Sequence, residues 1–328
     1  MGEFELLARV RERLPQPGPR VLLGSGDDAA VTAPAAATAT SVDALVDGVH
    51  FRREQASLAQ IGAKALAAGL SDLAAMGAET GEAYVVLGVP TDLDEAGCLE
   101  LLDGLAAIAA ETGTSLAGGD VTRAPALTLA ITVVGHAADA GRLVARSGGR
   151  PGDVLVLTGE LGGAAAGLFL LEHPDSAESL SADRKAALIS RQLEPRPRID
   201  AGRALAAAGA TAMIDLSDGL AGDARRLAAA SGAGARIDAA ALPVAAGVAE
   251  VATAAGRDPL ELAASGGEDY ELLAALPPDR VEAALAAAAD APNGVGLTRI
   301  GELVAGDGVE IRLPDGSPVR SAGFDQLA

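Results

Sequence analysis

A glycine loop with two adjacent aspartates, Gly24-Ser-Gly-Asp-Asp-Ala-Ala-Val31, limits which fold this chain can adopt. The spacing Gly24-x-Gly26-x-x-Ala29 matches the dinucleotide-binding fingerprint, in which a pyrophosphate lies at a helix N-terminus. Asp27 and Asp28 would repel that pyrophosphate, and Pro34 stops any helix after a few residues. The residues therefore favour a loop that holds divalent cations, or a tight turn with two solvated aspartates, over a dinucleotide fold. From the loop alone, the tight turn is the simpler interpretation.

The charge of the chain excludes several classes of partner. Its 328 residues include 45 acidic and 25 basic side chains, a formal charge of −20. A nucleic acid or an anionic membrane would be repelled by this charge, so we expect neither as a partner. Lys64 and Lys185 are the only lysines, and neither lies in a Walker-type phosphate loop. Phosphate binding would therefore need metal ions and arginines.

The cysteine content and the N-terminus favour a cytoplasmic protein. The single cysteine, Cys98, cannot form an intrachain disulfide and lies in an amphipathic helical pattern. The first residues lack the basic region and apolar core of a secretory signal, and no apolar run approaches the ~18 residues that span a membrane. We expect a cytoplasmic location.

Helical and strand-like patterns alternate along the chain, which predicts an α/β (α+β) fold. A segment dense in turn residues, Arg146–Asp153, predicts a boundary between two domains, at residues 1–147 and 148–328. The predicted helices cover residues 3–14, 57–76, 92–111, 163–171, 183–192, 198–208, 220–230, a pair within 244–264, and 279–289. The predicted strands cover residues 38–43, 83–89, 127–134, 154–157, 211–214, 271–276 and two short segments within 297–312.

Acidic residues recur beside glycine or serine, mostly at predicted strand ends and in loops. The positions are Asp27/Asp28, Asp43, Asp72, Asp120, Asp215/Asp218 and Glu268/Asp269. Each one alone is explained as a helix cap or a turn residue, although Asp72 lies in the apolar stripe of a predicted helix. Together, carboxylates at the ends of successive strands would converge on one edge of an α/β domain. Clustered carboxylates are the hard oxygen ligands that Mg²⁺ selects, so the sequence predicts magnesium-dependent phosphate chemistry.

These residues lie in ordered blocks that resemble the thiamine-monophosphate kinases of the aminoimidazole-ribonucleotide-synthetase-like superfamily. Two blocks are specific: Leu70–Ala78, which contains Asp72, and Ile214–Leu220, which contains Asp215 and Asp218. The blocks cover nearly the whole chain in the order of the family. The others are Gly26–Ala29, Ser41–Phe51, Gly118–Asp120, Arg146–Gly148 and Ser265–Leu272.

The resemblance implies that ATP phosphorylates thiamine monophosphate to thiamine diphosphate by direct in-line transfer with several Mg²⁺ ions. It also implies an N-terminal ATP- and Mg-binding domain whose sheet pairs in a homodimer, and a C-terminal α/β domain that contributes to the nucleotide and substrate site. No side chain is expected to act beyond this metal-held transfer. By the same resemblance, the metal ligands are Asp28, Ser41, Val42, Asp43, Asp72, Asp120, Asp215 and Asp218. The implied ATP contacts are Gly119, Asp120, Arg146 and Ser217, and the implied substrate contacts are His50, Glu268 and Phe324.

The sequence departs from the family at a few of these positions. Val42 and Val121 stand where the family usually has threonine, so Val42 could bind a metal only through its backbone carbonyl. Phe324 is either the partner of a thiamine ring or a hydrophobic plug for the C-terminus. His50 is either a substrate contact or a packed, hydrogen-bonded side chain.

Related enzymes and a non-catalytic sensor are the alternatives. A selenophosphate synthetase would need a reactive cysteine near the N-terminal glycine loop, and a hydrogenase-maturation dehydratase a C-terminal cysteine, whereas Cys98 is the sole cysteine. The Asp72 and Glu268 blocks disfavour the purine-synthesis enzyme of the superfamily. A sensor that only binds Mg²⁺ or nucleotide is disfavoured because six aspartates of the family pattern are retained.

Overall fold

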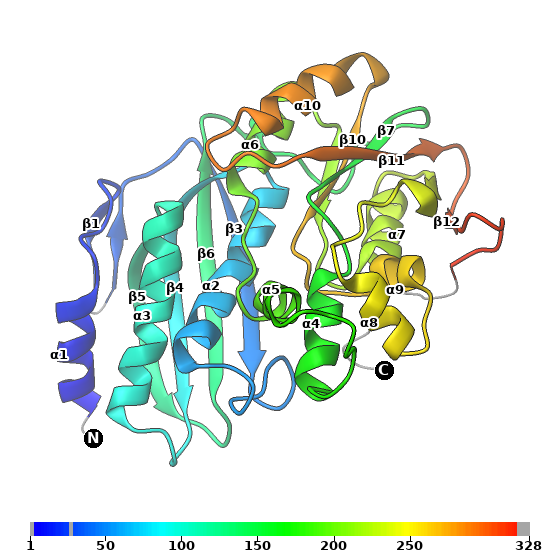
Figure 1. Ribbon diagram of the computed structural model, residues 1–328. Helices are drawn as coiled ribbons and strands as arrows, with labels where there is room; N and C mark the ends of the chain where they lie inside the picture. Colours follow the sequence, from blue (N-terminus) through cyan, green and yellow to red (C-terminus); the bar gives the residue numbers. More distant parts are fainter. Residues whose placement is uncertain (1–2, 26–28, 320–328) are drawn as a thin grey trace. The chain divides into compact units, whose positions relative to one another are not determined.

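The computed structural model describes residues 3–25 and 29–319, and its chain forms two compact units (Figure 1). Unit 1 comprises Met1–Leu73 and Ala78–Ala140, and unit 2 comprises Ala74–Gly77 and Gly141–Ala328. The predictions made for Gly26, Asp27, Asp28 and Phe324 fall outside the described residues.

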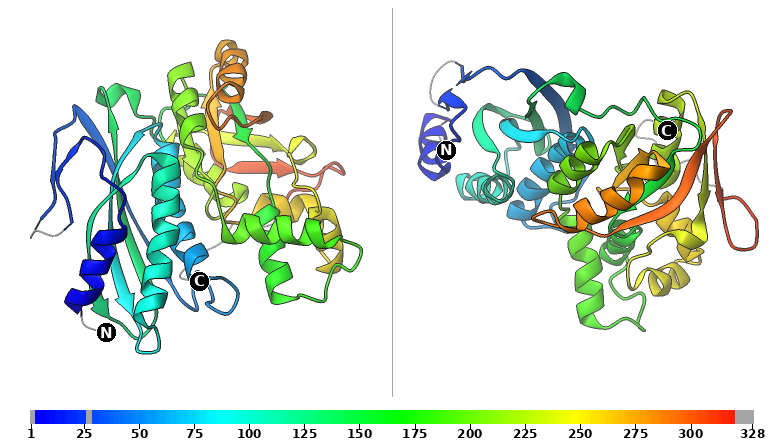
Figure 2. Two further views of the ribbon diagram at one scale, coloured as in Figure 1. Left: turned by 60° about the vertical axis from the view of Figure 1, so that its left-hand side comes forward. Right: turned by 90° about the horizontal axis from the view of Figure 1, so that it is seen from above.

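Unit 1 is a four-stranded sheet in the order β3-β6-β4-β5 with two long helices, α2 and α3, on one face (Figure 2). Only β4 and β5 are parallel in this sheet, and the other neighbouring strands are antiparallel. A two-stranded hairpin, β1 and β2, precedes it. The elements are α1 Glu3–Arg13, β1 Val21–Leu23, β2 Val31–Thr32, β3 Ala37–Val46, α2 Leu58–Ala75, β4 Glu79–Val89, α3 Glu95–Thr112, β5 Ser115–Arg123 and β6 Thr128–Ala137.

Small residues let the two helices of unit 1 pack closely without aromatic side chains. A Cβ added at Gly104 of α3 would lie 1.8 Å from the carbonyl oxygen of Ala59 in α2, so glycine is required at this crossing. The N-terminus of α3 is capped by Asp94, whose carboxylate accepts the Gly97 N–H at 2.9 Å. Its C-terminus ends at Gly113 in the left-handed conformation.

The other face of the unit 1 sheet carries exposed apolar side chains. Val42 of β3 is 66% exposed and Val86 of β4 is 43% exposed. Leu129, Ile131 and Val133 of β6, which alternate with partly exposed residues, are fully buried. This alternation is typical of an antiparallel sheet with one face packed on a core, and it leaves the face with Val42 and Val86 accessible.

Unit 2 contains a six-stranded sheet in the order β12-β9-β11-β7-β10-β8. Strands β9 and β12 are parallel, and the other neighbouring pairs are antiparallel. The elements are β7 Val154–Thr158, α4 Gly163–Glu172, α5 Ala182–Leu193, α6 Ile199–Ala208, β8 Ala212–Asp215, α7 Leu220–Ala230, β9 Gly234–Asp238, α8 Val248–Ala254, α9 Pro259–Ser265, β10 Leu272–Leu276, α10 Val281–Ala289, β11 Leu297–Val304 and β12 Val309–Arg312.

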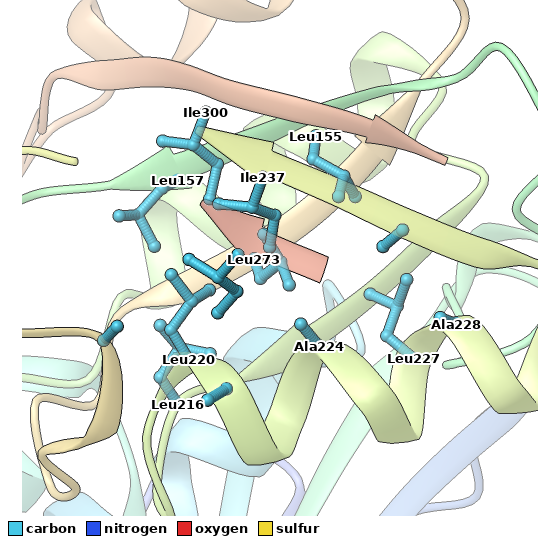
Figure 3. Packing of buried hydrophobic residues seen from close by; sticks show 14 of the residues in the cluster. Leu155, Leu157, Leu216, Leu220, Ala224, Leu227, Ala228, Ile237, Leu273 and Ile300 are labelled. Atoms are coloured by element: carbon cyan, nitrogen blue, oxygen red, sulfur yellow. The ribbon is translucent and has the colours of Figure 1, made fainter. Parts of the chain in front are cut away.

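One hydrophobic core cluster of unit 2 lies between its sheet and α7, and a second one lies among α4, α5, α8 and α9. Leu220, Ala224 and Leu227 recur at helical spacing on one face of α7 and are buried against aliphatic side chains of the sheet, including Leu157 and Leu273 (Figure 3). Aliphatic side chains and alanines thus fill the core of a chain that is only 2% aromatic. Burying such a leucine contributes about 2 kcal/mol, so many small contacts replace a few large ones.

The predicted arrangement of acidic residues at strand ends was wrong for two of them. Asp43 lies inside β3, opposite Ile131, because the strand continues three residues further. Asp120 lies inside β5, opposite Val86, where a turn was predicted. Most strand pairs are antiparallel, so the expected convergence at one edge of parallel strands does not apply. Strand β9 was not predicted, because Gly-Ala-Arg-Ile-Asp carries a weak strand signal.

Candidate functional site

The acidic site of unit 1 is built on β3 and α2. Ser41 and Asp43 are two residues apart on β3, so their side chains share the face that α2 covers. The Asp43 carboxylate oxygen Oδ2 lies 3.6 Å from where a Cβ of Gly69 in α2 would be. Three residues further along α2, Asp72 accepts a hydrogen bond from the Ser41 hydroxyl. The predicted ligands Ser41, Asp43 and Asp72 therefore come together.

Two carboxyl groups lie close together at this site and interact. Burial, the neighbouring charge of Asp72 and a hydrogen bond between the two carboxyl groups together raise the pKa of Asp43 to about 6. Two carboxylates and a hydroxyl supply only oxygen ligands, which suit a hard divalent cation. Val42, between them in the sequence, points its side chain to the opposite, exposed face of the sheet.

Gly119 and Asp120 are exposed residues of β5. A Cβ at Gly119 would lie 2.0 Å from the Val85 carbonyl oxygen, so only glycine lets β4 and β5 approach here. An apolar cavity of about 90 Å³ between α1, α3 and these strands borders both residues. Unit 1 thus places an apolar space beside an exposed carboxylate.

His50 follows β3 and is partly exposed. Its ring nitrogen Nδ1 accepts the Val46 backbone N–H at 3.1 Å. A hydrogen bond of this kind is expected if His50 is a packed side chain. It also fixes the orientation of the imidazole ring.

In unit 2, two predicted site segments are joined through their backbones. Asp215 is buried at the end of β8, and the residues after it pair with the segment before β10. The Glu268 N–H donates to the Ser217 carbonyl at 2.8 Å, and the Tyr270 N–H donates to the Leu216 carbonyl at 3.0 Å. A residue predicted to contact nucleotide, Ser217, and one predicted to contact substrate, Glu268, are therefore direct neighbours.

Asp218 is held by two residues that sequence reasoning missed. The Asp223 carboxylate accepts the Asp218 N–H at 3.0 Å, and Arg226 contacts Asp218 at 2.6 Å and Asp223 at 2.5 Å. Burial raises the pKa of Asp223 to about 6, against the opposite effects of the Asp218 N–H and Arg226. The spacing of Asp223 and Arg226, three apart on α7, was the available signal.

The segment from Glu268 to Glu271 has a strained backbone. Glu268 and Tyr270 have positive φ angles of 64° and 49°, a conformation that side-chain-bearing residues rarely adopt. Such strain persists where surrounding contacts determine the geometry, and it often occurs at functional sites.

Side-chain contacts hold this strained segment in place. The Asp269 carboxylate accepts the N–H groups of Gly162 and Ala164 at the start of α4, at 2.7 and 3.0 Å. Burial raises the pKa of Asp269 to about 7, although these two hydrogen bonds lower it. Buried Glu271 accepts two hydrogen bonds from Arg198, at 2.8 and 2.5 Å, and one from the Thr158 hydroxyl at 2.6 Å.

Arg146, the predicted nucleotide-binding arginine, is exposed in unit 2. Its backbone carbonyl accepts a hydrogen bond from the Ser231 hydroxyl at 3.1 Å, which ties its segment to the residue after α7. Sequence reasoning noted the segment that ends at Arg198 but gave that residue no role. Its spacing after two prolines, Glu-Pro-Arg-Pro-Arg, was the signal that could have identified it.

The described residues contain no group of three or more His, Cys, Asp or Glu side chains placed to hold a metal ion. Unit 1 supplies a pair of carboxylates with a hydroxyl, and the predicted ligand Asp28 falls in the part of the chain that is not described. None of the described helices combines the length and the apolar character needed to cross a membrane.

Comparison with known proteins identifies both units. Residues 26–137 match the N-terminal domain of AIR synthase related proteins, and residues 150–314 match the C-terminal domain. The thiamine-monophosphate kinase of Mycobacterium tuberculosis (strain CDC 1551 / Oshkosh) is 40% identical over 280 residues, 84% of this chain and 80% of that protein.

Solved structures extend the similarity to the fold. The thiamine-monophosphate kinase of Stenotrophomonas maltophilia K279a is 36% identical with a TM-score of 0.81, covering 97% of this chain and 98% of the other. AaThiL complexed with AMPPCP and TMP is 30% identical with a TM-score of 0.76, covering 88% and 86%. These findings confirm the mixed α/β fold of two synthetase-type domains. The chain therefore belongs to the AIR synthase related proteins and, among them, to the thiamine-monophosphate kinase family.

Proposed function

We propose that this protein transfers a phosphoryl group from ATP to thiamine monophosphate, giving thiamine diphosphate and ADP, by direct in-line transfer with several Mg²⁺ ions. The main support for this proposal is the backbone hydrogen bond between Ser217 and Glu268 in unit 2. It places both residues next to Asp215 and Asp218 in the chain fold. A relative of known structure holds AMPPCP, an ATP analogue, together with TMP, which supports both reactants. The acceptor is a phosphate oxygen that needs no strong general base, so positioning and charge stabilisation suffice.

The residues of unit 1 fit a magnesium ion. Ser41, Asp43 and Asp72 offer hard oxygen atoms, and burial with the Asp72 charge raises the pKa of Asp43, which supports a bound cation here. Bound Mg²⁺ would offset the negative charge of the two anionic reactants. The full proposed ligand set is Asp28, Ser41, the Val42 carbonyl, Asp43, Asp72, Asp120, Asp215 and Asp218.

The other site residues receive roles that follow from their chemistry. Gly119 and Asp120 border the apolar cavity of unit 1, which would suit part of a nucleotide base. Exposed Arg146 would bind phosphate oxygens, and Ser217 would contact the nucleotide. Glu268 would face the cationic ring system of thiamine monophosphate. His50 and Phe324 complete the proposed substrate contacts.

We further propose a cytoplasmic homodimer with domains at residues 1–147 and 148–328. The N-terminal domain would bind ATP and Mg²⁺ and form the dimer through its sheet, and the C-terminal domain would complete the nucleotide and substrate site. The uncovered sheet face with Val42 and Val86 supports this pairing, because exposed apolar side chains gather there. Sedimentation equilibrium should give twice the mass of the chain, and Val42→Asp should shift it towards monomer. A monomeric wild-type protein would exclude the dimer.

The decisive experiment is a product assay. Purified protein with Mg²⁺-ATP and thiamine monophosphate should form thiamine diphosphate and ADP, separated by liquid chromatography and identified by mass spectrometry. Free thiamine should not react. If no thiamine diphosphate forms while calorimetry still detects tight binding of Mg²⁺-ATP, the protein is a nucleotide-binding sensor and the proposed activity is wrong.

A further inference from the structure

A glutamine on the buried face of α5 contacts the proposed substrate residue Glu268. Gln192 is 5% exposed, and its Nε2 donates a hydrogen bond to Glu268 Oε2 at 2.5 Å. It lies one helical turn after Leu188, which is also buried. Burying an amide is costly unless it is hydrogen-bonded, so this position is poorly explained by packing alone.

The packing of α4 against α5 fixes where Gln192 can be. A Cβ added at Gly167 of α4 would lie 2.1 Å from the Leu188 carbonyl oxygen and 3.1 Å from the Gln192 Cβ. The two helices therefore touch through their backbones, and Gln192 starts from a rigid position. The start of α4 also binds Asp269, the residue after Glu268, through the Gly162 and Ala164 N–H groups. One pair of helices thus holds two successive acidic side chains.

Glu268 needs this support because its own backbone is strained. Its φ of 64° is maintained by the hydrogen bond to Ser217, but a glutamate side chain still has three rotatable bonds. Ordering such a side chain when a ligand binds costs free energy that a preorganised site avoids. A buried hydrogen bond to one carboxylate oxygen sets the orientation in advance.

Gln192 and Arg198 are chemically different donors to two neighbouring glutamates. Glu271 is held by the guanidinium of Arg198, which adds a positive charge. The donor that reaches Glu268 from α5 is a neutral amide, which orients the carboxylate without adding a positive charge. A carboxylate that must attract a cationic ring is better oriented by an amide than by a guanidinium.

We propose that Gln192 is a positioning residue that orients the Glu268 carboxylate towards the cationic ring system of thiamine monophosphate. This inference rests on the proposed function. It assigns Gln192 to recognition of the acceptor substrate and not to the transfer of the phosphoryl group. The expected signature is a change in the KM for thiamine monophosphate with little change in kcat or in the KM for ATP.

The test compares two substitutions on the same helix. Gln192→Met keeps the length of the side chain and removes the donor, and it should raise the KM for thiamine monophosphate about tenfold, the usual effect of losing a hydrogen bond to a charged group. Arg184→Met is the matched control, because Arg184 is an exposed residue of the same helix, eight residues before Gln192. It should leave that KM unchanged. Calorimetry should show the same tenfold loss of binding of thiamine monophosphate to Gln192→Met.

A second variant covers a failure of Gln192→Met to fold, which circular dichroism would detect. Gln192→Glu keeps the size of the side chain and places a like charge beside Glu268, so it should raise the KM more strongly. In a Glu268→Ala background, either substitution should add no further change. If the wild-type enzyme is active and a folded Gln192 variant has the same KM for thiamine monophosphate, the positioning role is wrong. A wild-type protein that forms no thiamine diphosphate overturns the proposed function itself.

Discussion

The acidic residues of the two candidate sites have different charged neighbours. In unit 1, the charged neighbour that raises the pKa of Asp43 is another carboxylate, Asp72. In unit 2, Asp218 is paired with Arg226, and Glu271 is paired with Arg198. Both candidate sites cluster carboxylates, and among the described residues arginines pair with those of unit 2.

This difference separates two uses of acidic residues. An uncompensated pair stores repulsion that a bound divalent cation can relieve, so it suits metal binding. A carboxylate paired with arginine or with backbone N–H groups is fixed in direction and suits the positioning of a loop. A buried carboxylate–arginine pair fixes the orientation of its side chains more than it adds net stability, because desolvation offsets much of the attraction.

The largest expected effect is that of Asp72→Asn in unit 1. Turnover of thiamine monophosphate should fall about 1,000-fold, because several kcal/mol of charge stabilisation depend on this ligand set. Thermal unfolding in the presence of EDTA should show unchanged or higher stability, because the repulsion with Asp43 is removed. Asp103→Asn, at an exposed aspartate of α3, is the control and should leave turnover unchanged. Full activity of the Asp72 variant would exclude this residue from the site.

A smaller effect is expected from Arg198→Met in unit 2. Removing the guanidinium leaves Glu271 buried without its cation, which should lower the free energy of unfolding by about 2 to 3 kcal/mol. Arg236→Met is the matched control, because Arg236 pairs with Glu302 at an exposed position and should cost less than about 1 kcal/mol. Urea unfolding measures both. Equal effects of the two substitutions would mean that the buried pair is not what holds the strained segment.

The smallest expected effect is a change in pH dependence from Asp269→Asn. The pKa of Asp269 is raised from its ordinary value of 3.8 to about 7 in the folded protein. The folded state therefore binds more protons than the unfolded state in this range, and the stability from this group is lost as the pH rises towards 7. The substitution should flatten the fall in unfolding free energy between about pH 6 and pH 7.

Asp315→Asn is the control for this pH series. Hydrogen bonds from Ser317 lower the pKa of the exposed Asp315, so its contribution to stability is lost only when the pH falls into the acidic range. The slope between pH 6 and pH 7 should not change. If the Asp269 variant also shows the same pH dependence of the unfolding free energy as the wild-type protein, burial does not raise the pKa of Asp269.

Local patterns in the sequence predicted most of the individual elements. The helix with Asp72 was expected at residues 57–76 and is found at Leu58–Ala75, because its apolar periodicity is long and regular. The strand with Asp120 was missed, because Gly118 and Gly119 read as a turn although they let β4 and β5 approach. Strand β9 was also missed, because its five residues, Gly-Ala-Arg-Ile-Asp, carry a weak strand signal.

The candidate site was predicted in part. The association of Ser41 and Asp43 follows from the two-residue period of a strand. Asp72 was singled out as an aspartate in the apolar stripe of a predicted helix, and the resemblance to a known family then implied its role as a ligand. Asp223, Arg226, Gln192 and Arg198 were missed as site residues. Gln192 and Arg198 contact partners that are 76 and 73 residues away in the chain. Asp223 and Arg226 contact Asp218, which precedes α7.

The sequence by itself determined the family, the mixed α/β class and the identities of the acidic residues, because these depend on local patterns and ordered motifs. The tertiary structure decided which acidic residues face another carboxylate and which face a cation. That distinction depends on strand order and helix packing, which bring together groups as far apart in the chain as Arg198 and Glu271. Charge compensation is a property of neighbours in space, and a sequence lists only neighbours along the chain.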